Sequence, residues 1–224
     1  MIPLAEAQQY VLDGCQPLET APIEIAQALG LVTAEPIVSN ELIPPFDNTA
    51  VDGYAVMAAD TQTVPVDLQV AGSIAAGQAP SEAVTAGTAI RIMTGAPLPD
   101  GADAVVMVED TTTADDGSRV TVGASVAAGS AVRRAGEDMQ PGQEVFPTGT
   151  QLQPGHLGVL ATLGVETISA HRRPVVGVIS TGDELVEGPQ ALKPGQIRDS
   201  NRRTLLSMVA QTGCTAVDLS LIHI

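Results

Sequence analysis

Two aspartates lie in a short stretch that is dense in turn-forming residues, PPFDNTAVDGYAV at 44–56. Asp52-Gly53 is a strong turn dipeptide and Asp47-Asn48 can form an Asx-turn, although a plain hairpin needs only one such pair. Because the first 90 residues contain no Lys or Arg, Asp52 would not bind an anion by charge. Its carboxylate could accept protons or hydrogen bonds, or hold a metal ion. The residues alone leave a turn and a chemical site both open.

A second pair of carboxylates follows an almost wholly apolar run, PVVGVIS at 174–180. If this run is a buried strand of an open α/β sheet, Thr181 and Gly182 lie at its carboxyl end, where such sheets bind ligands. A hydroxyl and exposed backbone N–H groups suit a phosphate or another oxyanion. Asp183 and Glu184 would repel that anion unless a divalent cation intervenes, and Mg²⁺ shared with phosphate fits this arrangement. A plain turn after the strand is the alternative.

Two further motifs carry candidate groups. In IMTGAPLPDG, Thr94 and Gly95 offer a hydroxyl and backbone N–H groups to an oxyanion, although a simple loop also explains the Pro and Gly residues. In RRAGEDM, at 133–139, the carboxylate of Asp138 could face a cleft. The alternative is that the acids of this motif only pair with its two arginines.

The segments around these motifs have three different patterns. Residues 1–40 resemble a connector with helices, since PLAEAQQYVLDG closes on Gly14 and IEIAQALG closes on Gly30. Short alternating runs separated by Gly, Pro and Asp then predict a small β-domain that resembles a barrel. These runs are VPVDLQVAG, GTAIRIMTG, ADAVVMVED and SRVTVGA.

The last part predicts an α/β unit. After a short helix, PGHLGVLATLG, and a strand, VETISAH, come the apolar strand, a Pro/Gly loop, the helix RRTLLSMVAQTG and a final strand, CTAVDLSLIHI. Ser200 or Asn201 is expected at the N-cap of the helix and Gly213 at its end. One such unit cannot bury both faces of a sheet, so we expect an incomplete α/β domain.

Composition argues against several classes of function. The net charge of −16 disfavours nucleic-acid binding, which needs many basic side chains. No apolar run approaches the roughly 18 residues typical of a membrane span, and the acidic start indicates a cytoplasmic protein. A disulfide or a zinc site is not expected, because the cysteines lie far apart and no histidine has zinc-like spacing with them. These residues are Cys15, Cys214, His156, His171 and His223.

All ten basic residues lie after position 90, and six of them form adjacent pairs. The pairs are Arg133-Arg134, Arg172-Arg173 and Arg202-Arg203. An anionic ligand would therefore be held by the later part of the chain. The alternative is that each pair is solvated and balances nearby acids.

Taken together and in this order, the motifs resemble the molybdopterin molybdenumtransferases of the MoeA type, which are related to the E domain of gephyrin. The likeness covers nearly the whole chain, with mild departures at Ile43, Thr49 and Val51, where the family commonly has Leu, Ser and Met. It rests on the motifs at 43–55, 92–106, 133–139, 174–186 and 195–201.

The resemblance implies an enzyme of molybdenum cofactor biosynthesis that inserts molybdate into adenylylated molybdopterin, releases AMP and uses Mg²⁺. It also implies a homodimer in which β-domain loops of one chain face the molybdopterin-binding domain of the other. Residue by residue, it assigns catalysis to Asp52, Thr94, Asp138 and Glu184, substrate binding to Thr181, Gly182, Ser200 and Asn201, and metal binding to Asp183 and Glu184.

The implied fold is α+β and multidomain. It has a helical and extended connector that dimerises, at 1–40 and 140–170, a β-barrel-like domain at 41–139, and an incomplete α/β molybdopterin-binding domain at 171–224. The family continues beyond this domain with a glycine-rich motif and a small β-domain. The alternative is therefore a dimeric binding or scaffold module of the gephyrin type without catalysis. An adenylyltransferase acting one step earlier is disfavoured, because that activity belongs to a domain without the DGYA and TGAP motifs.

Overall fold

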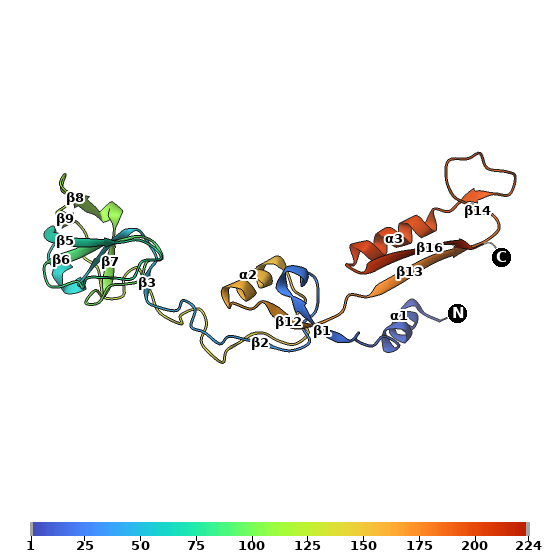
Figure 1. Cartoon of the computed structure of the whole chain (residues 1–224), viewed down its shortest axis with the longest axis horizontal. Helices are drawn as coiled ribbons and strands as arrows, with labels where there is room; N and C mark the ends of the chain where they lie inside the picture. Colours follow the sequence, from blue (N-terminus) through green and yellow to red (C-terminus); the bar gives the residue numbers. More distant parts are fainter. Residues whose placement is uncertain (1, 223–224) are drawn as a thin grey trace. The chain divides into compact units, whose positions relative to one another are not determined.

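The computed structural model describes residues 2–222, so His223 and the end of the last predicted strand lie outside the described part. The chain forms two compact units, one of Val38–Glu144 and one that joins Met1–Ile37 to Val145–Ile224 (Figure 1). Strands outnumber helices in the described part, which confirms a β-rich fold with few helices. No helix within residues 2–222 has both the length and the apolar character that a membrane span requires.

The unit at 38–144 is built on a six-stranded sheet in the order β7-β4-β6-β5-β9-β8. Neighbouring strands are antiparallel except for β5 and β6, which are parallel. The strands are β4 (Gly53–Val56), β5 (Val66–Ile74), β6 (Thr88–Ile92), β7 (Ala104–Met107), β8 (Thr111–Thr113) and β9 (Arg119–Val122). A short pair, β3 (Asn48–Thr49) with β10 (Val132–Arg133), and two 3₁₀ turns, η2 (Ala58–Thr61) and η3 (Val108–Asp110), complete the unit.

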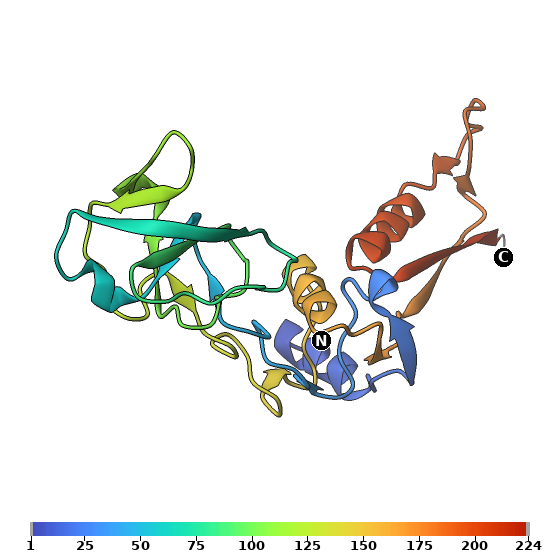
Figure 2. The same cartoon turned by 60° about the vertical axis from the view of Figure 1, so that its left-hand side comes forward.

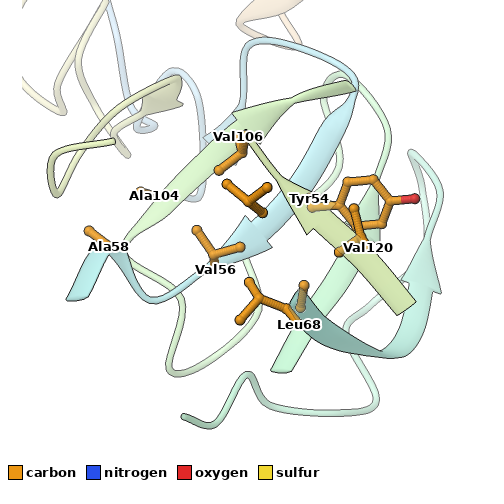
Figure 3. Close-up of a cluster of buried hydrophobic side chains, with 9 residues drawn as sticks. Tyr54, Val56, Ala58, Leu68, Ala104, Val106 and Val120 are labelled. Carbon is orange, nitrogen blue, oxygen red and sulfur yellow. The ribbon is translucent and has the colours of Figure 1, made fainter. Parts of the chain in front are cut away.

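Alternate residues of these strands form two apolar clusters. Tyr54, Val56 and Leu68 belong to one cluster, which Figure 3 shows between the strands, whereas Ala55, Ile90 and others belong to the second. All four residues of β4 are buried because this strand contributes to both clusters. Most members are Val, Ile, Leu and Ala, which agrees with the scarcity of aromatic residues in the sequence.

The first part of the other unit contains α1 (Leu4–Asp13), which ends at Gly14 as predicted, and β1 (Thr20–Glu24). β1 pairs in antiparallel register with β12 (Thr167–His171), and α2 (Pro154–Thr162) forms where PGHLGVLATLG predicts it. The helix expected over IEIAQALG is wrong. Its first residues belong to β1 and only η1 (Ile25–Gln27) is helical, because pairing with β12 satisfies the backbone instead.

The later part has the predicted order of strand, loop, helix and strand. β13 (Val175–Thr181) pairs in parallel with β16 (Thr215–Ile222), and α3 (Asn201–Gln211) packs along both strands (Figures 1 and 2). The loop contains a small parallel pair, β14 (Leu185–Val186) with β15 (Ile197–Arg198). The remaining pair of the chain is β2 (Ile37–Val38) with β11 (Glu144–Phe146).

β13 is buried on one face only, as expected for a single α/β unit. Val178 is only 6% exposed, but Val175 is 69% and Ile179 is 46% exposed. Side chains alternate across a strand, and α3 covers one face of the pair, so the second apolar face is left open.

Candidate functional site

The stretch at 44–56 is not a hairpin. Its first part is bonded to the motif at 133–139: Ile43 and Met139 exchange backbone hydrogen bonds of 2.9 and 3.1 Å, and Gly136 N donates to Pro44 O at 2.9 Å. Its last part is β4, which lies between β6 and β7. Asp47-Asn48 therefore lies at the start of β3 and Asp52-Gly53 at the start of β4, and because these strands pair with other strands the hairpin reading is wrong.

The middle of the stretch is bonded to the TGAP motif. Thr49 N donates to Ala96 O at 3.2 Å, and Gly95 N donates back to Thr49 O at 2.9 Å. Leu98 N donates to Asp47 O at 2.9 Å. Three motifs that are far apart in sequence, at 43–56, 92–106 and 133–139, are thus assembled within one compact unit.

Asp52 and Thr94 are in direct contact. The backbone N and the hydroxyl Oγ1 of Thr94 both donate to Asp52 Oδ1, each at 2.7 Å, across 42 positions of sequence. These two bonds lower the pKa of Asp52 below its ordinary value, with a smaller contribution from the positive charge of Arg91. Thr94 thus donates both its backbone N–H and its hydroxyl to a carboxylate of the protein.

One oxygen of Asp52 is left for other partners. Both bonds from Thr94 end on Oδ1, and within residues 2–222 no hydrogen bond reaches Oδ2. The residue is exposed. A lowered pKa makes a carboxylate a weak proton acceptor near neutral pH, so the arrangement favours a fixed negative charge or a hydrogen-bond acceptor over a general base.

Gly53, which follows Asp52 and begins β4, must be a glycine. A Cβ at this position would lie 2.0 Å from Val106 O on the neighbouring strand β7. Only glycine allows this approach of the two backbones. The close packing places the carboxylate of Asp52 at the strand end, beside the loop that follows β6.

The positive charge beside Asp52 is itself held in place. The guanidinium of Arg91 lies over the ring of Tyr54, with Cζ 5.1 Å from the ring centroid, and Nη1 donates to the Tyr54 hydroxyl at 3.4 Å. Tyr54 Oη is in turn 2.7 Å from Thr113 Oγ1. Sequence reasoning missed Arg91, although it is the first base of the chain and lies three positions before Thr94.

Asp138 forms an ion pair with Arg133, and both side chains are about half exposed. Arg134 Nη1 reaches Asp47 Oδ2 at 2.6 Å, and Ala135 N donates to Asp47 Oδ1 at 2.8 Å. The backbone bond from Ala135, followed by the Arg134 bond, lowers the pKa of Asp47. Asp47 therefore bonds to a distant motif. Arg133 pairs with an acid of its own motif, as the alternative predicted, whereas Arg134 pairs with Asp47 of the first motif.

The remaining candidates lie in the other unit, around the carboxyl end of β13. Thr181, Ser200 and Asn201 line a cleft of about 260 Å³ there, together with Asp199 and Arg202. Gly182 has φ of +148°, and the space of its missing Cβ is taken by the Glu184 carboxylate, with Oε2 at 2.4 Å from the Cβ position. Sequence reasoning therefore placed several of its candidates beside one cleft.

The cap of α3 differs in detail from the prediction. Ser200 occupies the N-cap position but its side chain makes no capping bond. Asp199 Oδ1 accepts the Arg202 N–H instead, at 3.1 Å. Arg202, from one of the three arginine pairs, is 2% exposed and is paired with carboxylates, which agrees with the alternative that such pairs balance nearby acids.

Known proteins resemble this chain in sequence and fold. A family model described as the MoeA N-terminal region, domains I and II, matches residues 2–164. The chain belongs to the MoeA family. This family membership confirms the resemblance that the motifs indicated.

Curated relatives of this MoeA chain are named molybdopterin molybdenumtransferases. One from Haemophilus influenzae is 40% identical over 223 residues, which cover 99% of this chain and 55% of the relative. One from Bacillus subtilis is 35% identical over 224 residues, which cover 97% and 52%. A crystal structure of a molybdopterin biosynthesis moeA protein from Pyrococcus horikoshii aligns with a TM-score of 0.88 and 34% identity, covering all of this chain and 60% of that one. The chain spans about half the length of the curated relatives it matches.

Proposed function

We propose that this chain contributes to molybdenum cofactor biosynthesis, by inserting molybdate into adenylylated molybdopterin with release of AMP. The names of the relatives support this assignment at the level of the family. At the level of atoms, the proposal rests on the contact of Asp52 with Thr94. This contact connects two of the motifs and leaves an exposed, negatively charged carboxylate.

In this proposal Asp52 acts as a charge and hydrogen-bond acceptor. Thr94 fixes one carboxylate oxygen with two donors, and Oδ2 faces the ligand. Because the pKa of Asp52 is lowered, its charge is present throughout the neutral range. Thr94 acts by orienting this carboxylate. Asp138, held by Arg133 in the same unit, is proposed as a further catalytic residue.

The cleft beside β13 is proposed to bind the pterin substrate. Thr181, Ser200 and Asn201 line this cleft, and Gly182 follows Thr181 in sequence; together they offer hydroxyl, amide and backbone groups that suit a phosphate. Negative charge next to them comes from Asp183 and Glu184. These groups would tolerate an anionic substrate best with a cation between them.

Asp183 and Glu184 fit a Mg²⁺ ion that is shared with substrate. Within residues 2–222 no group of three or more His, Cys, Asp or Glu side chains forms a complete metal site. Mg²⁺ is commonly held by only one or two carboxylates plus substrate phosphates and water, and this chain supplies that number. When bound, the ion would neutralise phosphate charge and polarise the phosphoryl group.

A homodimer in the cytoplasm is part of the proposal. α1 has no buried residue, and Leu4 and Val11 are 74% and 63% exposed. An amphipathic helix with an open apolar stripe is more stable when a partner covers it. A second copy of the chain would supply such a cover.

The test uses two proteins, the 224-residue chain and a fusion protein that joins it to the part of the Haemophilus influenzae relative left uncovered by the match. We expect the fusion protein to bind adenylylated molybdopterin and to release AMP when molybdate is added. The chain alone should not complete the reaction, because one face of the β13–β16 pair is open. Binding without release by the fusion protein would favour a binding module instead.

A further inference from the structure

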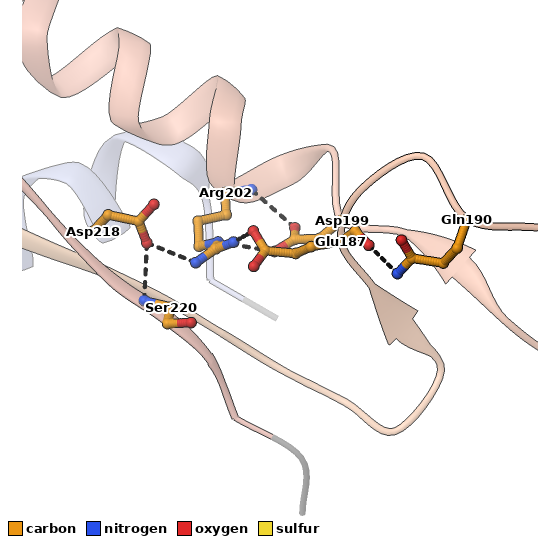
Figure 4. Close-up of polar contacts among 6 residues, drawn as sticks. All are labelled: Glu187, Gln190, Asp199, Arg202, Asp218 and Ser220. Atoms are coloured by element: carbon orange, nitrogen blue, oxygen red, sulfur yellow. Dashed lines mark hydrogen bonds and ion pairs between the residues drawn. The ribbon is translucent and has the colours of Figure 1, made fainter. Parts of the chain in front are cut away.

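The guanidinium of Arg202 is surrounded by three carboxylates from different segments. Nε donates to Asp199 Oδ2 at 3.1 Å, Nη1 donates to Asp218 Oδ1 at 2.6 Å, and Nη2 pairs with Glu187. Figure 4 shows these side chains converging below the start of α3. Each nitrogen thus takes a different acid, which a planar guanidinium can do and a lysine ammonium on a flexible stem cannot do in the same geometry.

The three acids come from three parts of the α/β region. Glu187 directly follows β14 and Asp199 directly follows β15, whereas Asp218 lies on β16. β14 and β15 are paired over only two residues each, so their ladder alone holds the loop at 183–199 weakly. Arg202 therefore connects this loop to the helix and sheet beneath it.

Because Arg202 is buried, its ion pairs favour one arrangement of the loop over others. The side chains of Arg202 and Asp199 are each 2% exposed, while Glu187 and Asp218 are 44% and 39% exposed. Buried ion pairs add little net stability, because desolvation offsets their attraction, but they penalise any arrangement that breaks them. Asp199 also accepts the Arg202 N–H, and Asp218 accepts Ser220 N at 2.9 Å, so two of the acids are fixed by further bonds.

We infer that Arg202 is a positioning residue for the cleft beside β13, because it fixes the loop that carries Asp183 and Glu184 against the start of α3. Its nitrogens are occupied by protein carboxylates, so it acts on a ligand through the segments that it holds. The link to a pterin substrate rests on the proposed function, but the positioning itself does not.

The first experiment measures amide hydrogen exchange in the 224-residue chain. Glu187→Gln removes the charge from one of the loop's two contacts with Arg202 and leaves Asp199 in place, and Glu24→Gln is a control for loss of one exposed carboxylate on β1. In the Glu187 variant we expect exchange at 183–199 to rise about tenfold, with α3 and β16 changed much less. The control should leave all three segments unchanged. Unchanged exchange at 183–199 would overturn the inference, as would an equal rise throughout α3 and β16.

The second experiment measures binding of adenylylated molybdopterin to the fusion protein by calorimetry, with and without Mg²⁺. Glu187 does not line the cleft. If its contact with Arg202 stabilises only its own segment, replacing Glu187 should leave ligand binding unchanged. We expect Glu187→Gln and Arg202→Lys to weaken the Mg²⁺-dependent binding about tenfold and the Mg²⁺-independent binding less, because the loop carries the two proposed metal ligands. Equal losses with and without Mg²⁺ would contradict the positioning of those ligands. If the unmodified fusion protein binds no adenylylated molybdopterin, the proposed substrate is wrong, and the exchange experiment still decides the role of Arg202.

Discussion

At the scale of single residues, Asp52 gains its character from Thr94. Two short hydrogen bonds to one oxygen stabilise the ionised carboxylate, although the side chain is exposed. A similar pattern occurs elsewhere in the chain: Ser118 N and Oγ donate to Asp116 Oδ1 at 3.0 and 2.8 Å, and the pKa of Asp116 is also lowered. Asp116 is thus a natural control, since it has the same local chemistry outside the three assembled motifs.

Replacing Thr94 by Ala should raise the pKa of Asp52 toward its ordinary value of 3.8, because one of the two donors is lost. A depressed pKa contributes stability that is present above the unfolded value and is lost as pH falls through the folded value. The stabilisation from Asp52 should therefore be constant between pH 5 and 8, and should be lost only as the pH falls below 3.8. Carboxyl carbon shifts in an NMR titration measure this pKa. Thr94→Ser keeps the hydroxyl and should change it little, and an unchanged pKa in the Ala variant would contradict the assignment.

Both partners of this contact could be singled out from the sequence, but the contact itself could not. Asp52 and Thr94 each lie in a motif rich in turn residues, and each motif is explained locally by a loop. Their contact depends on the register of β4 against β6 and on the loop that follows β6. Neither is encoded by spacing within one motif.

At the scale of elements, the approach of β4 to β7 depends on Gly53. Gly53→Ala would place a methyl group against Val106 O, so the strands must separate. We expect a loss of about 2–4 kcal/mol in the free energy of unfolding of the 38–144 unit, measured by urea denaturation. Gly72→Ala is the control, because its Cβ on β5 would meet nothing closer than 3.6 Å. Equal losses in the two variants would contradict the steric argument.

The loop after β13 gives a second prediction at this scale. Glu184→Gln should weaken Mg²⁺-dependent binding of adenylylated molybdopterin by the fusion protein more than Mg²⁺-independent binding, since only the former needs the charge. Calorimetry with and without Mg²⁺ makes the comparison. The neutral side chain keeps the size that fills the space over Gly182. A loss that does not depend on Mg²⁺ would argue against a metal role for Glu184.

Most elements of this chain follow from local patterns, and the exceptions have clear causes. The runs at β5, β6, β7 and β9 are alternating or β-branched, as is typical of strands, and α2 and α3 have helical spacing. The segment IEIAQALG also has helical spacing, but its first residues pair with β12, about 145 residues later in the chain. A pattern within one segment does not reveal so distant a partner. The two-residue strands were not predicted, because pieces so short carry no periodic signal.

At the scale of the whole molecule, the apolar stripe of α1 should lead to self-association. Leu4, Ala7 and Val11 recur with helical spacing on a helix without buried residues. We expect sedimentation to show a mass that rises with concentration toward that of a dimer. Val11→Glu should weaken this association by about tenfold or more, because it puts a charge on the stripe. Gln9→Glu adds the same charge on the polar face and should not. A monomer at every concentration would contradict the dimer.

The sequence gives the number of charged side chains in the molecule, but it does not show which of them pair with one another. The absence of bases before position 90 suggested that the later arginines hold an anionic ligand. In the structure Arg133, Arg134 and Arg202 each pair with carboxylates, and the Asp47 partner of Arg134 is 87 positions away. Partners so distant depend on the tertiary fold, so a count of charges overestimates the charge available to a ligand.

The central claim is that Asp52 and Thr94 act as one unit in molybdate insertion. A double-mutant cycle in the fusion protein tests it, with molybdate-dependent release of AMP measured for Asp52→Asn, Thr94→Val and the double variant. If the two residues act together, Asp52→Asn should reduce the rate on the order of a hundredfold, and the double variant should be no slower than the slower single variant. Asp116→Asn should keep the normal rate, and circular dichroism should show each variant folded. Losses that multiply in the double variant, or a near-normal rate for Asp52→Asn, would contradict the account.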